Sequence, residues 1–163
     1  MALVLGIGLA AQAGQDNRAP EVPQEIAVDS STNKVHFHGF AIGSQNYTWD
    51  GSSWGTAVPE ATLYDSDGNV VATHFAGPTW QSNSGSRVVG AVDTKVTMDT
   101  NSIPWVRLIA VSTEGPGIFA DTTFVQRVHT VAGKAPAAPG LVVGQVFKSP
   151  YMADYYFYRG SNN

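Results

Sequence analysis

The sequence predicts a single all-β domain, either an antiparallel β-sandwich or a flattened barrel of about nine or ten strands. Apolar residues alternate with polar ones, or form short runs, between clusters of turn residues along most of the chain. No stretch of helical length repeats with the 3.6-residue period of an amphipathic helix. The length of 163 residues also fits one domain.

The first half of the chain shows alternation interrupted by turn residues. Residues 35–40 alternate, and residues 42–49 continue as a further expected strand. The Asp50-Gly51-Ser52-Ser53 segment is typical of a turn, because Gly and Ser suit turn backbones. Residues 61–64 and 70–75 predict a hairpin, since the Asp67-Gly68 pair between them favours a tight turn.

The second half contains apolar runs between Gly- and Pro-rich breaks. Residues 103–112 form a strongly apolar run and are expected to be a central strand, which Glu114-Gly115-Pro116-Gly117 ends. The other strands expected here are residues 87–92, 122–131, 141–147 and 151–159, with a Pro/Ala/Gly loop at 132–140.

Residues 1–13 have the pattern of a secretory signal peptide. The apolar run closes on Ala11-Gln12-Ala13, a small-x-small cleavage pattern, so the mature chain is predicted to begin near Gly14. The run is too short for a transmembrane segment, which needs about 20 residues; a buried first strand is the alternative. We therefore expect a secreted or periplasmic protein with an extended arm at 14–24 and one β domain at 25–163.

The composition excludes several classes of function. Charged residues make up 13% of the chain and the net charge is −4, whereas average domains carry roughly 25% charged residues. No cluster of Lys and Arg is present, so no nucleic-acid partner is expected, because phosphate binding needs clustered cations. The absence of cysteine excludes disulfides, thiol catalysis and zinc–thiolate sites.

Two motif matches are interpreted as turns. The Gly51-Ser52-Ser53-Trp54-Gly55 segment fits G-x-S-x-G, but that nucleophile motif needs a strand-to-helix turn and no helix is expected after it. Asp65, Asp67 and Asn69 place oxygens at alternate positions, as calcium loops do. The Gly position and the missing downstream Glu do not fit an EF-hand, so a hairpin turn is preferred, with calcium as the alternative.

The four histidines are the candidate metal ligands. His36 and His38 lie two positions apart on one expected strand and would share a face. Together with His74 or His129 they could hold copper or zinc, if the fold brings three imidazole nitrogens to one point. Hydrogen-bonded or solvent-facing histidines are the preferred interpretation, and no cofactor is expected.

Aromatic residues form the candidate binding surface. Along a strand, Tyr155 and Phe157 face one side, while Tyr156 and Tyr158 face the other. One set is expected in the core, and an exposed second set could stack on a sugar ring or contact a partner. Burial of both sets is the preferred reading, because aromatic residues are favoured in strands anyway.

Several segments together form a recognisable set. They are His74-Phe75-Ala76-Gly77-Pro78-Thr79-Trp80 and residues 20–23, 43–48, 84–90, 103–105, 124–128, 133–136 and 151–158. This set resembles the family known as domain of unknown function 3455, over about residues 20–159 in order. The resemblance implies a secreted bacterial or fungal protein, and it carries no established activity.

The chain departs from the family pattern in one respect, and two of its motifs can be interpreted physically. Many family members carry a cysteine where this chain has Trp49, and another before the last strands, where this chain has only Ala and Pro. Gly77-Pro78 is expected to fix a turn that directs His74 and Trp80 toward neighbouring space. The planar guanidinium of Arg127 favours an ion pair with an interior carboxylate.

The leading functional hypothesis is a non-enzymatic module that binds a small molecule, a glycan, or an envelope or extracellular protein. Its candidate contact residues are His74, Trp80, Arg127, Tyr156 and Tyr158. The second hypothesis is a histidine-based metal-binding protein or metalloenzyme. The third is a structural module that self-assembles through exposed strand edges, because its low charge removes a usual defence of such edges.

Overall fold

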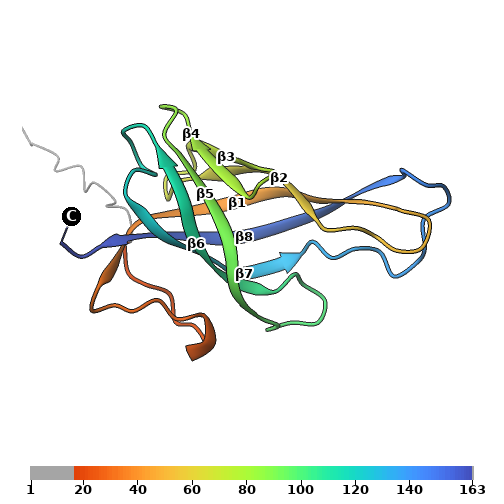
Figure 1. The fold of residues 1–163 in the computed structure, drawn as a ribbon, viewed down its shortest axis with the longest axis horizontal. Coiled ribbons are helices and arrows are strands. Elements are labelled where there is room, and N and C mark those ends of the chain that lie inside the picture. Colours follow the sequence, from red (N-terminus) through yellow and green to blue (C-terminus); the bar gives the residue numbers. More distant parts are fainter. Residues whose placement is uncertain (1–16, 163) are drawn as a thin grey trace, which may run out of the picture.

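Eight antiparallel strands close into one barrel in the computed structural model, which describes residues 17–162 (Figure 1). The strands are β1 (Asn33–Thr48), β2 (Val58–Tyr64), β3 (Val70–Phe75), β4 (Thr79–Ser82), β5 (Arg87–Val96), β6 (Trp105–Glu114), β7 (Thr122–Ala132) and β8 (Val146–Gly160). Each strand pairs with the next along the chain, and β1 pairs with β8. The all-β prediction is confirmed, and the barrel is the architecture found.

The strand count differs from the expected nine or ten for identifiable reasons. The expected strands 35–40 and 42–49 are one continuous strand, β1, and the expected strands 141–147 and 151–159 are replaced by one strand, β8, which begins only at Val146. Both strands are long because they run the length of the barrel and continue beyond it at one end (Figure 1). In contrast, β4 has four residues, too few for a period-two pattern to be recognised.

Alternation along the strands fills the barrel interior. The inward positions form one apolar cluster that includes Leu63, Val88 and Val125, all fully buried. Tyr155 and Phe157 belong to this cluster. A barrel of eight strands encloses an interior just wide enough for packed side chains or one small ligand.

Phenylalanine rings fill one end of the barrel. The β6–β7 connection places the fully buried ring of Phe119 against Phe37 and Phe157, with ring centroids 6.0 and 4.7 Å apart. The backbone N–H of Phe119 donates to Ser86 Oγ at 3.3 Å, which ties this connection to the β4–β5 turn. We call this end, defined by these three rings, the closed end.

The segment before β1 covers part of the outer wall. The short 3-10 turn η1 (Gln24–Ile26) places Ile26, fully buried, in a cluster with Tyr156 and Tyr158. Gln126 Nε2 donates to the Ile26 carbonyl at 2.6 Å, and the Tyr158 hydroxyl donates to Gln126 Oε1 at 2.5 Å. Tyr156 and Tyr158 are therefore 8% and 3% exposed. The preferred expectation that both aromatic sets are buried is met, and an exposed aromatic strip is not found.

Two connections are turns, as predicted. The Asp65 carboxylate accepts hydrogen bonds from the backbone N–H groups of Asp67 and Asn69 and from Asn69 Nδ2. Both carboxylate oxygens of Asp65 are thus used within the β2–β3 hairpin. Asp50 accepts from Ser52 and Ser53 in the same way, and the next element is strand β2, so the G-x-S-x-G match lies in a turn.

Trp49 joins two segments in which, according to the family resemblance, many other members carry cysteines. Its ring lies so close to Gly140 that a Cβ at position 140 would be 2.4 Å from Trp49 Cγ. The backbone N–H of Trp49 also donates to the Gln145 carbonyl at 2.8 Å. Side-chain packing and a backbone hydrogen bond therefore connect the end of β1 to the segment before β8.

Barrel closure leaves few exposed strand edges for the self-assembly hypothesis. Each of the eight strands within residues 17–162 has a neighbour on both sides, although residues 146–150 of β8 pair with β1 alone. In the same residues, no helix is long and apolar enough to cross a membrane. The expected signal peptide at 1–13 lies outside the described residues.

Candidate functional site: an interior cavity

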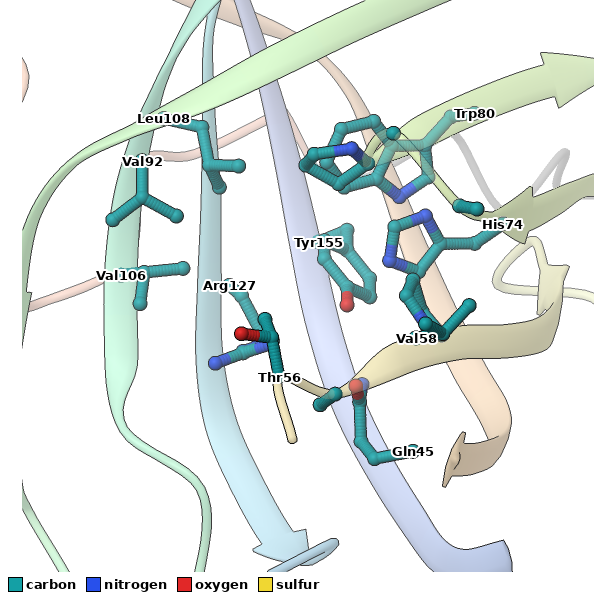
Figure 2. A pocket seen from close by; sticks show the side chains of 15 residues that line it. Gln45, Thr56, Val58, His74, Trp80, Val92, Val106, Leu108, Arg127 and Tyr155 are labelled. Carbon is teal, nitrogen blue, oxygen red and sulfur yellow. The ribbon is translucent and has the colours of Figure 1, made fainter. Parts of the chain in front are cut away.

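A cavity of about 310 Å³ lies inside the barrel, and Figure 2 shows the side chains that line it. Gln45 lines it toward the other end of β1 from Phe37, so the cavity lies away from the closed end. Side chains from all eight strands line it, together with residues of the β1–β2 and β3–β4 connections. The lining residues are Gln45, Thr56, Ala57, Val58, Pro59, His74, Ala76, Gly77, Pro78, Trp80, Val92, Val106, Leu108, Arg127 and Tyr155. Its volume lies at the lower end of the range for small-molecule sites, roughly 300–1,000 Å³.

His74 and Trp80 form one wall of the cavity. They are register partners across the β3–β4 hairpin, and their rings stack with centroids 4.3 Å apart and an interplanar angle of 5°. Gly77 turns the chain between them with φ of +107°, which glycine adopts without strain, so the expected turn is present. Tyr155 packs edge-on against both rings, at 5.2 and 5.4 Å.

His74 is neutral, and its second ring nitrogen is in the form that can accept a hydrogen bond. Its Nδ1 donates to the Thr79 carbonyl at 2.9 Å, which leaves Nε2 without a proton in the neutral ring. Burial lowers the pKa of His74 to about 3; the Thr79 hydrogen bond opposes this shift and the charge of Arg127 adds to it. At neutral pH this imidazole therefore carries no charge.

Arg127 is the one charged side chain among the lining residues. Its Nε and Nη2 donate to the Pro104 carbonyl at 3.3 and 2.9 Å. No Asp or Glu in residues 17–162 forms an ion pair with it. The predicted ion pair with an interior carboxylate is therefore wrong: a backbone carbonyl holds the guanidinium instead.

The charge of Arg127 acts on the neighbouring hydroxyls and rings. Burial raises the pKa of Tyr155, and the nearby guanidinium opposes that rise. The Tyr155 hydroxyl also lies 3.2 Å from the Tyr151 hydroxyl.

One further nitrogen at the cavity is buried without an acceptor. Trp80 is 1% exposed, and its Nε1 has no hydrogen-bond partner among the described residues. A buried polar group left unsatisfied typically costs about 1–3 kcal/mol. The cavity lining therefore supplies more hydrogen-bond donors than the protein itself uses.

The structure unites three of the five candidate contact residues. His74, Trp80 and Arg127 all line the cavity. Tyr156 and Tyr158 lie on the outer face of β8, beneath η1, and line none of it. Gln45 was not predicted as a site residue, although period two along β1 indicates it, because Gln45 follows the inward Ala41 by four positions.

The four histidines lie in three separate places. His36 is the extra residue of a β-bulge between Val35 and Phe37, and its Nε2 lies 2.8 Å from the Ile118 carbonyl. The bulge interrupts the alternation, so His36 and His38 are not simple neighbours on one face as predicted. His74 lies on another strand, β3, and lines the cavity inside the barrel.

His38 and His129 flank one carboxylate on the outer wall. Asp154 Oδ1 lies 3.8 Å from His38 Nε2, and Asp154 Oδ2 lies 2.7 Å from His129 Nδ1. Nowhere in residues 17–162 do three His, Cys, Asp or Glu side chains form a group that could hold a metal ion. The convergence of three imidazoles that the metal hypothesis required is therefore not found.

Comparison with known proteins yields one match. A family model described as protein of unknown function (DUF3455) matches residues 30–159, from just before β1 to nearly the end of β8. No curated protein matches the chain, and no solved structure matches it.

Proposed function

The chain belongs to the DUF3455 family, and for this member we propose a secreted or periplasmic, non-enzymatic function: the barrel binds a small organic molecule in its interior cavity. The observation that carries the proposal is the cavity itself. It is mostly apolar, with a few convergent polar groups from several strands, which is the usual composition of small-molecule sites.

An interior site favours a small molecule over the other partners considered. A glycan chain or a protein surface would need exposed contact residues, and Tyr156 and Tyr158 are covered by η1. His74, Trp80 and Tyr155 instead present their rings to an enclosed space, where a compact ligand can contact all three.

The state of His74 supports binding over catalysis. A general acid or base works best with a pKa near the working pH. Burial keeps the pKa of His74 at about 3, so the ring does not exchange protons near neutral pH. Its role in this proposal is to accept a hydrogen bond and to form a flat wall with Trp80.

Blocking the cavity tests the proposal. We would titrate the protein with 3-phenylpropan-1-ol, indole and octan-1-ol by isothermal titration calorimetry. Val92 lines the cavity and is 58% exposed, so Val92→Trp narrows the opening without burying a new side chain in the core. We expect this variant to bind at least about tenfold more weakly, through lost contacts worth about 1.4 kcal/mol.

The matched control is Val111→Trp. Val111 is 59% exposed and does not line the cavity, so the same substitution there should leave binding unchanged. Equal effects of the two variants, or no binding of any compound by the unaltered protein, would rule out the interior site.

The compartment is tested separately. The full-length chain with a C-terminal tag would be expressed in a bacterium, fractionated and subjected to N-terminal sequencing. We expect it in the periplasm or medium, beginning near Gly14, because residues 1–13 have the pattern of a cleaved signal peptide. An uncleaved cytoplasmic product would contradict this expectation.

A further inference from the structure

We infer that the ligand of the cavity is a small organic anion, a compact apolar body with a carboxylate or similar group that Arg127 binds. This inference rests on the proposed function and specifies the chemical class of the ligand.

The first argument is a positive charge without a counter-charge. Arg127 is always ionised, and protein interiors pair buried or half-buried charges with opposite ones. Its protein partner is the neutral carbonyl of Pro104, and no carboxylate lines the cavity. An anionic ligand would supply the negative charge that the described residues do not.

The second argument is the orientation of the guanidinium. Two of its nitrogens share one acceptor, the Pro104 oxygen, so the planar group is held in place before any ligand arrives. A fixed guanidinium recognises a planar carboxylate well and loses less side-chain entropy on binding. The Tyr155 hydroxyl lies next to the guanidinium, and it is 3.2 Å from the Tyr151 hydroxyl.

The third argument is the kind of polar group at the cavity. Arg127 offers only donors, and Trp80 Nε1, on another lining residue, has no acceptor among the described residues. A carboxylate offers only acceptor positions, about four in number. An oxygen-rich anion therefore fits this lining better than an amine, which would bring further donors and a like charge.

The apolar part of the ligand also has a place. Val92, Val106 and Leu108 face His74 and Trp80 across the cavity, with Tyr155 and Arg127 between the two walls (Figure 2). An aromatic or short aliphatic body would lie between these walls while its charged group meets Arg127.

A matched series of three compounds tests the inference. They are 3-phenylpropionate, 3-phenylpropan-1-ol and 3-phenylpropylamine, which share one body and differ in charge. At pH 7.5 we expect the unaltered protein to bind the acid about tenfold or more tightly than the alcohol, as for a charge-assisted hydrogen bond, and the amine most weakly.

Variants assign the preference to Arg127. Arg127→Met should bind acid and alcohol alike, and Arg127→Lys should keep part of the preference, because it keeps the charge but loses the planar fork. The control is Arg87→Met, which removes the same charge from a residue paired with Glu114 and outside the cavity. It should retain the full preference for the acid.

The outcomes separate the two proposals. If the alcohol or the amine binds the unaltered protein as tightly as the acid, the anion inference is wrong and the proposed function stands. If none of the three compounds binds, both fail. A preference for the acid that survives in Arg127→Met would overturn the assignment to Arg127. Should thermal melts show that Arg127→Met does not fold, the compound series and Arg127→Lys decide.

Discussion

The two ends of the barrel interior are built from the same alternating strands but filled in different ways. At the closed end, Phe37, Phe119 and Phe157 pack ring against ring. Toward the other end, Arg127 and Gln45 share the interior with apolar residues, and about 310 Å³ is left open. The comparison indicates that packing at the closed end stabilises the fold, while the cavity end is less tightly packed and leaves room for the proposed ligand.

Removing a ring from the closed end should have the largest effect. Phe119→Ala deletes a fully buried ring, so we expect a loss of about 3–5 kcal/mol in the free energy of unfolding, measured by urea denaturation. Binding of 3-phenylpropan-1-ol should persist wherever the variant is folded. Phe75→Ala is the control, because that ring is 38% exposed and should cost far less. Similar costs for the two variants would contradict a stabilising closed end.

Lowering the pH should destabilise the fold mainly through His74, at the cavity end. Burial lowers the pKa of folded His74 to about 3, whereas an unfolded histidine titrates near 6.5. Between these values the unfolded chain binds more protons, so stability is complete above pH 6.5 and falls as the pH falls. The slope should approach about 1.4 kcal/mol per pH unit below pH 6.

Urea denaturation between pH 4.5 and 7 measures this slope. His74→Phe keeps a ring against Trp80 and should flatten the curve. Burial also lowers the pKa of His36, so a smaller slope of the same sign should remain until His36→Gln is added. Parallel curves for the unaltered protein and His74→Phe would show that His74 does not cause the acid sensitivity.

A moderate effect is expected on the outer wall, where η1 covers the barrel. Gln126 is fully buried and links the Ile26 carbonyl to the Tyr158 hydroxyl. Gln126→Ala leaves both groups without that partner and should cost about 1–3 kcal/mol in thermal or urea unfolding. Gln24→Ala, at an exposed position of η1, serves as the control. An unchanged stability of Gln126→Ala would mean that the contact between η1 and the barrel contributes little to the free energy of unfolding.

The smallest effect should come from the surface pair near the cavity end. Glu60 and Lys148 lie 2.8 Å apart, but their side chains are 63% and 61% exposed. Solvent screens such pairs, so Glu60→Gln should leave the melting temperature and ligand binding unchanged within error. A clear shift in binding would show that surface charges, and not Arg127 alone, affect the ligand.

Most of the fold could be predicted because its signals are local. Alternation identified the strands, and Asp-Gly identified the β2–β3 hairpin. The closure of the barrel could not be predicted, since it depends on β1 pairing with β8 from the far end of the chain. Strand β4 was missed because four residues are too few for a period to be recognised.

The candidate site was predictable only in part. The turn at Gly77 correctly indicated that His74 and Trp80 share one region. That Tyr156 is covered could not be deduced from β8, because the covering residue, Ile26, lies more than a hundred positions away. The partner of Arg127 was predicted wrongly because the sequence shows which side chains carry charge. It does not show which backbone carbonyl will lie beside a guanidinium, as that of Pro104 does.

The β1–β8 ladder has a consequence for how the chain folds. Asn33 pairs with Gly160 and Thr48 with Val146, so the two longest strands meet only after nearly the whole chain is present. Contacts between such distant residues carry a large loop-closure entropy and slow folding, typically to milliseconds or seconds for β topologies. Until β8 arrives, β1 and β7 each present an open edge on which nascent chains can aggregate. A chain that loses its last strand, even with every cavity residue before Tyr155 intact, would remain in that vulnerable state.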